Sequence, residues 1–174
     1  MTAVWTPPRT WATGELVTAA LLNAHLRDNL EFLKTPPTGA YTLSETADYT
    51  TTSTAFVDVD AGRLALTLVT AGGDVLVGFT GTFGRSGVTL VIYLDVDVDG
   101  VRLAGDDGLL FEQFGTGGAN DKVLHFVALK RGLPAGSHTF KLQWRVSTGM
   151  ATLYAGAGTP NKDAHPQFWA REVS

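Results

Sequence analysis

Residues 138–147 read His-Thr-Phe-Lys-Leu-Gln-Trp-Arg-Val-Ser, and this stretch decides the fold class. Side chains two residues apart lie on the same face of a β-strand. An apolar residue at every second position therefore predicts a strand with one buried face and one solvated face. The Pro-Ala-Gly sequence at 134–136 supplies residues that favour a turn just before it. The alternating apolar residues are Phe140, Leu142, Trp144 and Val146.

The same alternation recurs through most of the chain after Gly39, interrupted by short turns rich in Gly, Asp and Asn. Short connections favour antiparallel neighbours. Strands with no helix between them predict a sandwich or a closed barrel and exclude a parallel α/β sheet. We therefore expect a mainly β protein built as an antiparallel β-sandwich. The predicted strands are Thr54–Asp60, Arg63–Thr70, Asp74–Phe83, Val88–Asp97, Val101–Ala104, Leu110–Phe114, Lys122–Lys130, His138–Ser147, Ala151–Tyr154 and Phe168–Val173.

A helical pattern precedes the strands, from Thr18 to Lys34. Thr18 is a suitable N-cap, and Pro36-Pro37 ends the helix. An amphipathic helix of this length is marginal alone, so its apolar stripe must meet the rest of the chain or copies of itself. The stripe consists of Ala19, Leu22, Leu26, Leu30 and Leu33.

Written as heptads, this helix places Asn29 in the apolar seam. A polar residue in such a seam can fix register and oligomeric state. Two heptads are equally compatible with a dimer, or with one helix packed on its own domain. The residues that we assign to oligomerisation are Leu22, Leu26, Asn29, Leu30 and Leu33.

The first fourteen residues predict an extended arm, because Pro7-Pro8 disfavours helix and removes two amide donors. Trp5 and Trp11 are large aromatics on a segment too short to form a core. We expect them to dock on another surface, and the alternative is that they fold back on this chain's own sandwich. The predicted organisation is an arm at 1–14, an amphipathic helix at 15–34, a Pro-rich linker at 35–40 and a β-sandwich domain at 41–174.

Composition excludes several classes of function. The net charge of -4 and the lack of a Lys/Arg cluster argue against a nucleic-acid partner. No apolar run reaches the length of a membrane helix, and no signal peptide is recognisable, so we expect cytoplasmic synthesis and no membrane insertion. Without cysteine there are no disulfides or thiolate sites. Charged residues make up only 17% of the chain, which is low for a soluble domain and favours burial of surface in an assembly.

The sharpest local motif is Asp95-Val-Asp97-Val-Asp99-Gly100, followed by Asp106 at the twelfth position. Calcium loops place carboxylates at positions one, three, five and twelve and a glycine at six. The competing interpretation, which we favour, is a strand that ends in an Asp-Gly hairpin turn, with the carboxylates on a solvated edge. We otherwise expect no cofactor.

Enzymatic motifs are absent from the sequence. The four histidines lack metal-ligand spacing, and there is no Gly-x-Ser-x-Gly elbow and no phosphate-binding glycine loop. We therefore expect a protein that is not an enzyme. The distant alternative is a small carbohydrate-active hydrolase, which needs paired carboxylates that only the Asp-rich hairpin offers.

The segment at 5–33, WTPPRTWATGELVTAALLNAHLRDNLEFL, resembles one that recurs at the start of phage and prophage structural proteins, ahead of variable β-rich domains. The resemblance implies a virion location and a particle-anchoring role for Trp5, Pro8, Arg9 and Trp11. It is carried by Trp5, Pro8, Trp11, Gly14, Glu15, Thr18, Leu22, Asn23, Arg27, Asp28 and Asn29.

The stretches 133–144 and 151–155 look like the late strands of tumour-necrosis-factor-like domains on phage fibres and capsid surfaces. This likeness implies a jelly-roll or tumour-necrosis-factor-like sandwich that assembles as a homotrimer. Together the two resemblances predict a trimeric tail-fibre or head-fibre protein that is assembled in the host cytoplasm, binds other virion proteins and displays its sandwich to a host glycan or protein. The alternative is a capsid decoration protein that stabilises the head.

Overall fold

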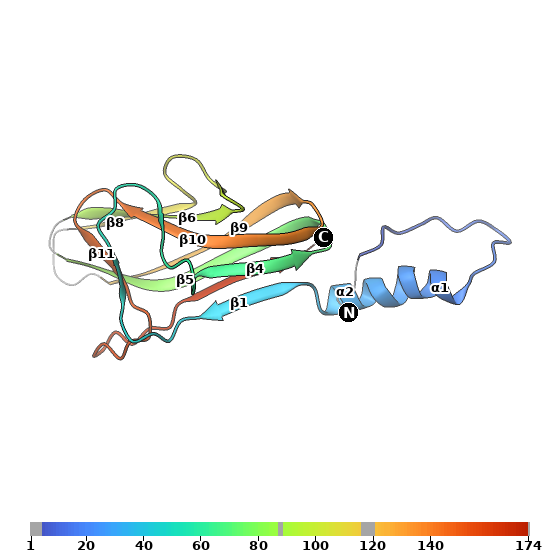
Figure 1. The fold of residues 1–174 in the computed structure, drawn as a ribbon, viewed down its shortest axis with the longest axis horizontal. Helices are drawn as coiled ribbons and strands as arrows, with labels where there is room; N and C mark the ends of the chain where they lie inside the picture. The colour runs from blue at the N-terminus through green and yellow to red at the C-terminus, as the bar shows by residue number, and fades with distance from the viewer. Residues whose placement is uncertain (1–4, 87–88, 116–120, 174) are drawn as a thin grey trace.

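The computed structural model describes residues 5–86, 89–115 and 121–173. Met1–Val4, Val88 and Ser174, which fall within predicted segments, lie outside the described residues. A β-sandwich forms the body of the molecule, and a single helix projects from one end of it with the N-terminal arm running alongside (Figure 1). The predicted antiparallel β-sandwich preceded by one helix is confirmed.

The helix is continuous from Ala19 to Lys34 but changes its winding twice. The Oγ1 of Thr18 accepts the amide of Leu21 at 3.3 Å, as predicted for the N-cap. A π-helical segment in the middle widens the helix, a distortion that is common at functional sites. The three parts are α1 (Ala19–Leu22), the π-helical segment η1 (Asn23–Arg27) and α2 (Asp28–Lys34).

The first sheet, called sheet A, is built around the long strand β5. β9 pairs with one edge of β5, while β12 and β11 pair with successive parts of the other edge. β1 extends the sheet beyond β12, and β2 extends it beyond β11. The strands are β1 (Thr38–Thr42), β2 (Tyr49–Thr51), β5 (Gly73–Ser86), β9 (Lys122–Leu133), β11 (Met150–Leu153) and β12 (Gln167–Glu172).

The second sheet, sheet B, is built around β10 and β6, which pair with each other. β4 and β3 pair with the free edge of β10, and β7 and β8 pair with the free edge of β6. All pairings in both sheets are antiparallel. The strands are β3 (Val57–Asp58), β4 (Ala65–Thr70), β6 (Leu90–Val98), β7 (Val101–Arg102), β8 (Leu110–Phe114) and β10 (Gly136–Val146).

Alternation of side chains explains the core between the sheets. The predicted apolar face of β10 is fully buried, and Trp144 contacts Phe83 of β5 with ring centroids 6.3 Å apart. Two sequence predictions need correction. Residues 38–40, assigned to the linker, begin β1, and neither β1 nor β2 was predicted because Thr, Gly and Tyr dominate these short strands.

Candidate assembly surfaces

The N-terminal arm lies on the helix of its own chain (Figure 1). The side chain of Asn29 accepts the amide of Thr6 and donates to the carbonyl of Thr6, both at 2.8 Å. The Trp5 ring lies against Phe32, with centroids 5.9 Å apart. Within its own chain, Trp5 therefore packs on the end of the helix, beside Val173. Its docking on another protein stays a prediction.

Farther along the arm, Trp11 contacts His25 edge-on with centroids 6.0 Å apart. The guanidinium of Arg9 lies 4.7 Å from the Trp11 ring centroid and forms an ion pair with Glu15. Trp11 is still 40% exposed, and Pro8 and Arg9 are exposed as well. Of the predicted anchoring residues, Trp5 therefore packs on the helix, while Pro8, Arg9 and Trp11 are exposed to solvent.

The leucines of the predicted stripe are not covered by the arm or by the sandwich. Their exposed fractions, between 42% and 65%, are high for leucines on an ordered helix. We call this set the leucine ridge, and its members are Leu22, Leu26, Leu30 and Leu33.

Asn29 corrects the heptad interpretation. Its side chain is 7% exposed and both of its polar atoms bind Thr6, so Asn29 faces the arm and is not part of an intermolecular seam. The helix therefore has two faces. Asn29 and Phe32 face the arm. Leu22, Leu26 and Leu30 are 42% to 65% exposed, and the 58% exposed Leu33 borders the crevice that Trp5 and Val173 line.

A second exposed apolar surface occupies part of the outer face of sheet A. An antiparallel sheet with one solvated face normally carries polar residues there, but strand register places Arg171, Leu76 and Leu129 in one row across three strands. The next row contains Trp169, Gly78 and Val127. Val127 and Leu129 are 51% and 42% exposed.

Gly78 is required where Trp169 crosses it. A Cβ atom built on Gly78 would lie 2.6 Å from Nε1 of Trp169 and closer still to two of its ring carbons, so only glycine lets the indole rest on the sheet. Beside it lies a hollow of about 430 Å³ whose lining includes Ala40, Leu76 and Val173 and no carboxylate or histidine. The alternation of apolar residues along the sequence did not predict this surface, because alternation describes one strand at a time and does not say which strands lie side by side.

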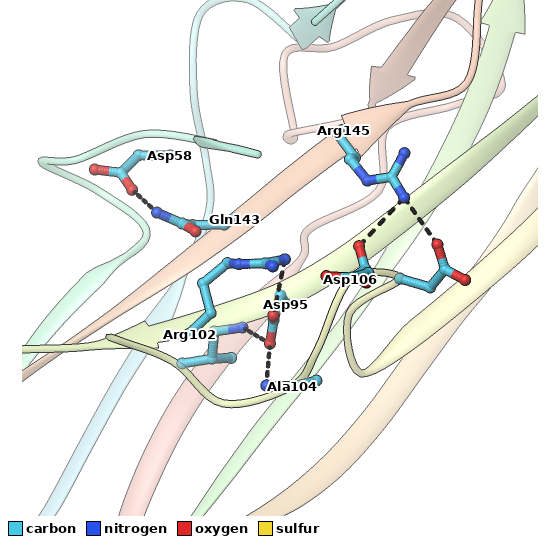
Figure 2. A network of polar contacts seen from close by, with 9 residues as sticks. Asp58, Asp95, Arg102, Ala104, Asp106, Gln143 and Arg145 are labelled. Atoms are coloured by element: carbon cyan, nitrogen blue, oxygen red, sulfur yellow. Dashed lines mark hydrogen bonds and ion pairs between the residues drawn. The ribbon is translucent and has the colours of Figure 1, made fainter. Parts of the chain in front are cut away.

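The outer face of sheet B carries a network of polar contacts (Figure 2), beside the exposed side chains of Val69 and Phe111. Asp95 is fully buried, and its Oδ1 accepts the amides of Val96 at 2.8 Å and Ala104 at 3.3 Å. Its Oδ2 lies 3.4 Å from Nη1 of Arg102. Burial raises the pKa of Asp95, because water no longer stabilises the charged carboxylate. Asp95 therefore holds the 101–104 segment against the sheet.

The other predicted calcium ligands have separate partners. Asp97 accepts the amide of Gly100 at 2.9 Å, Asp99 binds His138 and Thr139, and the carbonyl of Asp106 accepts Arg145. Within residues 5–86, 89–115 and 121–173, no group of three His, Cys, Asp or Glu side chains is placed to hold a metal ion. The sequence motif therefore does not form a calcium loop.

The favoured alternative, a solvated hairpin edge, is also wrong for Asp95 and Asp97. β6 lies inside sheet B, paired with β10 on one side and with β7 and β8 on the other. The hairpin turn itself is confirmed, because Asp99 and Gly100 both have positive φ angles, of 54° and 90°.

Two arginines that the sequence did not single out complete this face. Phe56 lies between them, with the guanidinium of Arg102 at 4.1 Å and that of Arg145 at 5.3 Å from its ring centroid. Arg145 also stacks on Tyr93 at 3.6 Å and pairs with Asp107 at 2.9 Å. Because Phe56 precedes β3, these contacts hold the chain entering β3 and the loop after β7 on sheet B.

Among the described residues, no helix has both the length and the hydropathy to cross a bilayer. No protein-family model matches the sequence. No curated protein is significantly similar to it. The predicted phage-type segment at 5–33 therefore stays a resemblance.

Solved structures of similar fold include tumour necrosis factor and virus proteins. Eiger TNF from S. frugiperda is 16% identical, with a TM-score of 0.45 over 79% of this chain and 94% of that one. Murine APRIL is 12% identical, with a TM-score of 0.41 over 78% and 99%. A chain of infectious bursal disease virus Gx strain is 14% identical, with a TM-score of 0.41 over 79% of this chain but 37% of that one. At these identities the likeness concerns the fold alone.

Proposed function

We propose that this chain is a non-enzymatic structural protein of a bacteriophage particle, a homotrimer of the tail-fibre or head-fibre type. The observation that carries the proposal is the leucine ridge, which stands clear of the sandwich. Four exposed leucines on one helix face have no role in folding a single chain, whereas a parallel bundle of three helices buries them in a common seam.

The outer face of sheet A supplies a second contact between subunits. Trp169, Leu76, Val127 and Leu129 are apolar residues of the kind that concentrate in interface cores. Burying them together with the leucine ridge leaves sheet B, with its arginines and aspartates, on the outside of the trimer. Sheet B is then the surface displayed to a host glycan or protein.

The arm attaches the trimer to other virion proteins. Because Asn29 and Phe32 hold the arm on the helix, the exposed edge formed by Pro8, Arg9 and Trp11 is prearranged before binding. Such preorganisation lowers the entropic cost of docking. The resemblance of residues 5–33 to the leading segment of phage structural proteins supports this role and the virion location.

A decoration protein that stabilises the capsid is the second candidate, since the same exposed ridge and arm edge suit a lattice contact. Copy number separates the two functions. A decoration protein approaches the abundance of the major capsid protein, and a fibre is far scarcer. Cryo-electron microscopy of particles carrying the chain locates it on the head or on the tail.

Analytical ultracentrifugation of the full chain tests the trimer. The wild type is expected to sediment at three times the monomer mass, and the double variant Leu26→Gln/Leu30→Gln as a monomer with an unchanged β-sheet circular dichroism signal. Asn23→Gln, at an exposed helix position that is not one of the ridge leucines, is the matched control and stays trimeric. Wild-type protein that sediments as a monomer at about 100 μM would refute the trimer.

Deletion of residues 1–14 tests the arm. The truncated chain is expected to stay trimeric and folded, because the leucine ridge and both sheets are intact, but to be absent from purified particles. Normal incorporation of the truncated chain would show that the arm is not the anchor.

A further inference from the structure

One histidine lies inside the sandwich, at the end that carries the helix. His138 is 6% exposed and alternates with Phe140 and Leu142, so its ring points between the sheets. Glu172 of β12 points into the same interior from sheet A and is fully buried. Burying a charged group without a partner costs free energy. These two side chains therefore need partners.

Both ring nitrogens of His138 face hydrogen-bond acceptors. Nδ1 lies 2.6 Å from the carboxylate oxygen Oδ2 of Asp99, and Nε2 lies 2.9 Å from the carbonyl oxygen of Pro134. Neither oxygen can donate when Asp99 is ionised. A neutral imidazole has a single N–H and can satisfy only one of these contacts, whereas the imidazolium donates to both.

The charges around the ring favour this charged form. Asp99 comes from the β6–β7 turn and also accepts the amide of Thr139 at 2.8 Å. Glu172 of β12 is a further negative charge that favours the protonated ring. The positive charge of Lys130 in β9 lowers the pKa of Asp99. The adjacent strand β4 has no charged residue. The bond to Asp99 raises the pKa of His138, burial opposes this, and the Pro134 carbonyl and Glu172 raise it further.

The same residues connect the sandwich to the helix. The Oε2 of Glu172 accepts the amide of Ala71 at 3.0 Å, and the backbone amide of Glu172 donates to the carbonyl of Pro37 at 3.0 Å. Pro37 lies three residues after the last residue of α2. His138 therefore joins the β6–β7 turn to the β9–β10 turn, and Glu172 joins the β4–β5 turn and Pro37 to the end of β12.

We infer that His138 is a charged clamp: as an imidazolium it ties the turns at the helix-bearing end of the sandwich to one another, and loss of its proton at alkaline pH loosens that end. A neutral ring must abandon either Asp99 or Pro134, and it removes the positive charge that interacts with Glu172. The helix root, bonded through Pro37 to Glu172, is the part of the molecule that this change reaches.

The direction of the pH dependence follows from proton linkage. The folded state holds the His138 proton more tightly than the unfolded state does. The clamp therefore contributes its full stability below the unfolded histidine pKa of about 6.5, and this stability is lost as pH rises through the folded value. On the acid side, the bond to Thr139 lowers the pKa of Asp99, with the bond to His138 next, so the Asp99 contribution is lost only as pH falls below the ordinary aspartate range.

Long-range ¹H–¹⁵N spectra of the full chain at pH 5 to 10 test the inference directly. At pH 7 both ring nitrogens of His138 are expected to show protonated shifts, with a titration midpoint above the ordinary histidine value of about 6.5. Amide exchange at Ala71, Gly100 and Thr139 is expected to accelerate above this midpoint beyond its intrinsic pH dependence. A neutral tautomer of His138 at pH 7 would refute the inference, independently of the results with substituted proteins.

Three substitutions separate the clamp from other alkaline effects. The melting temperature of the wild type is expected to fall as pH rises above the ordinary histidine pKa of about 6.5, and in His138→Gln this fall should be absent because glutamine does not titrate. His125→Gln is the matched control and should fall like the wild type. If His138→Gln fell equally, or if Asp99→Asn left the His138 midpoint unchanged, the inference would be wrong.

Discussion

Asn29 and Thr6, 23 residues apart in sequence, exchange two hydrogen bonds of 2.8 Å, so one asparagine side chain satisfies both backbone polar groups of an arm residue. A side-chain amide can do this because it carries one acceptor and two donors. The arm and the helix therefore act as one unit, and the leucine ridge is left free on the other face.

Replacing Asn29 by alanine is expected to detach the arm without unfolding the sandwich. The loss of two half-buried hydrogen bonds costs about 1–3 kcal/mol of arm docking. Hydrogen exchange and limited proteolysis within residues 6–13 should increase several-fold, while the strands stay protected. The exposed helix residue Asn23, changed to alanine, is the control, and equal exposure of the arm in both variants would contradict this role of Asn29.

Gly78→Ala is expected to displace Trp169. The added methyl group overlaps the indole, and overpacking of this kind costs about 1–3 kcal/mol. Both the melting temperature and the tryptophan fluorescence should change. Gly105→Ala is the control, since nothing lies within 4 Å of a Cβ at that position, and it should behave like the wild type.

Asp95→Ala is expected to destabilise the fold by about 2–4 kcal/mol, because it removes two amide acceptors and leaves the Arg102 guanidinium without its carboxylate. Denaturant unfolding measures the loss. Asp106 binds Arg145 through its backbone carbonyl, which Asp106→Ala leaves in place. The free energy of unfolding of this variant should therefore stay within about 0.5 kcal/mol of the wild-type value.

Calcium at up to about a millimolar is expected to leave the melting temperature unchanged and to release no heat in a calorimetric titration. Asp95, Asp97 and Asp99 each have separate protein partners and do not converge on one point. A saturable heat that disappears in Asp97→Asn would contradict this.

The sequence predicted best those features that depend on short-range periodicity. Alternation along residues 138–147 correctly predicted a strand with one buried face, and Thr18 with the double proline correctly bounded the helix. These signals act within a few residues, where backbone geometry alone decides which side chains share a face.

The same periodicity could not predict what each face meets. Asn29 lies in the helix where a heptad seam would be, yet it bonds Thr6, because the arm folds back through two prolines and a glycine turn that no spacing rule describes. Asp95 matched a calcium loop, but its buried position depends on β10, whose Gln143 lies directly across from it. Such pairings between distant segments are set by the packing of the whole sandwich.

Trp5 and Val173, near opposite ends of the sequence, line one crevice beside Phe32 and Leu33. A short peptide joining Trp5 to Val173 would therefore need to span little distance, and the chain could be reopened at the exposed Ser147-Thr148 turn between β10 and β11. Such a circular permutant would keep every strand pairing. It would also place its new termini at the end of the sandwich opposite the helix.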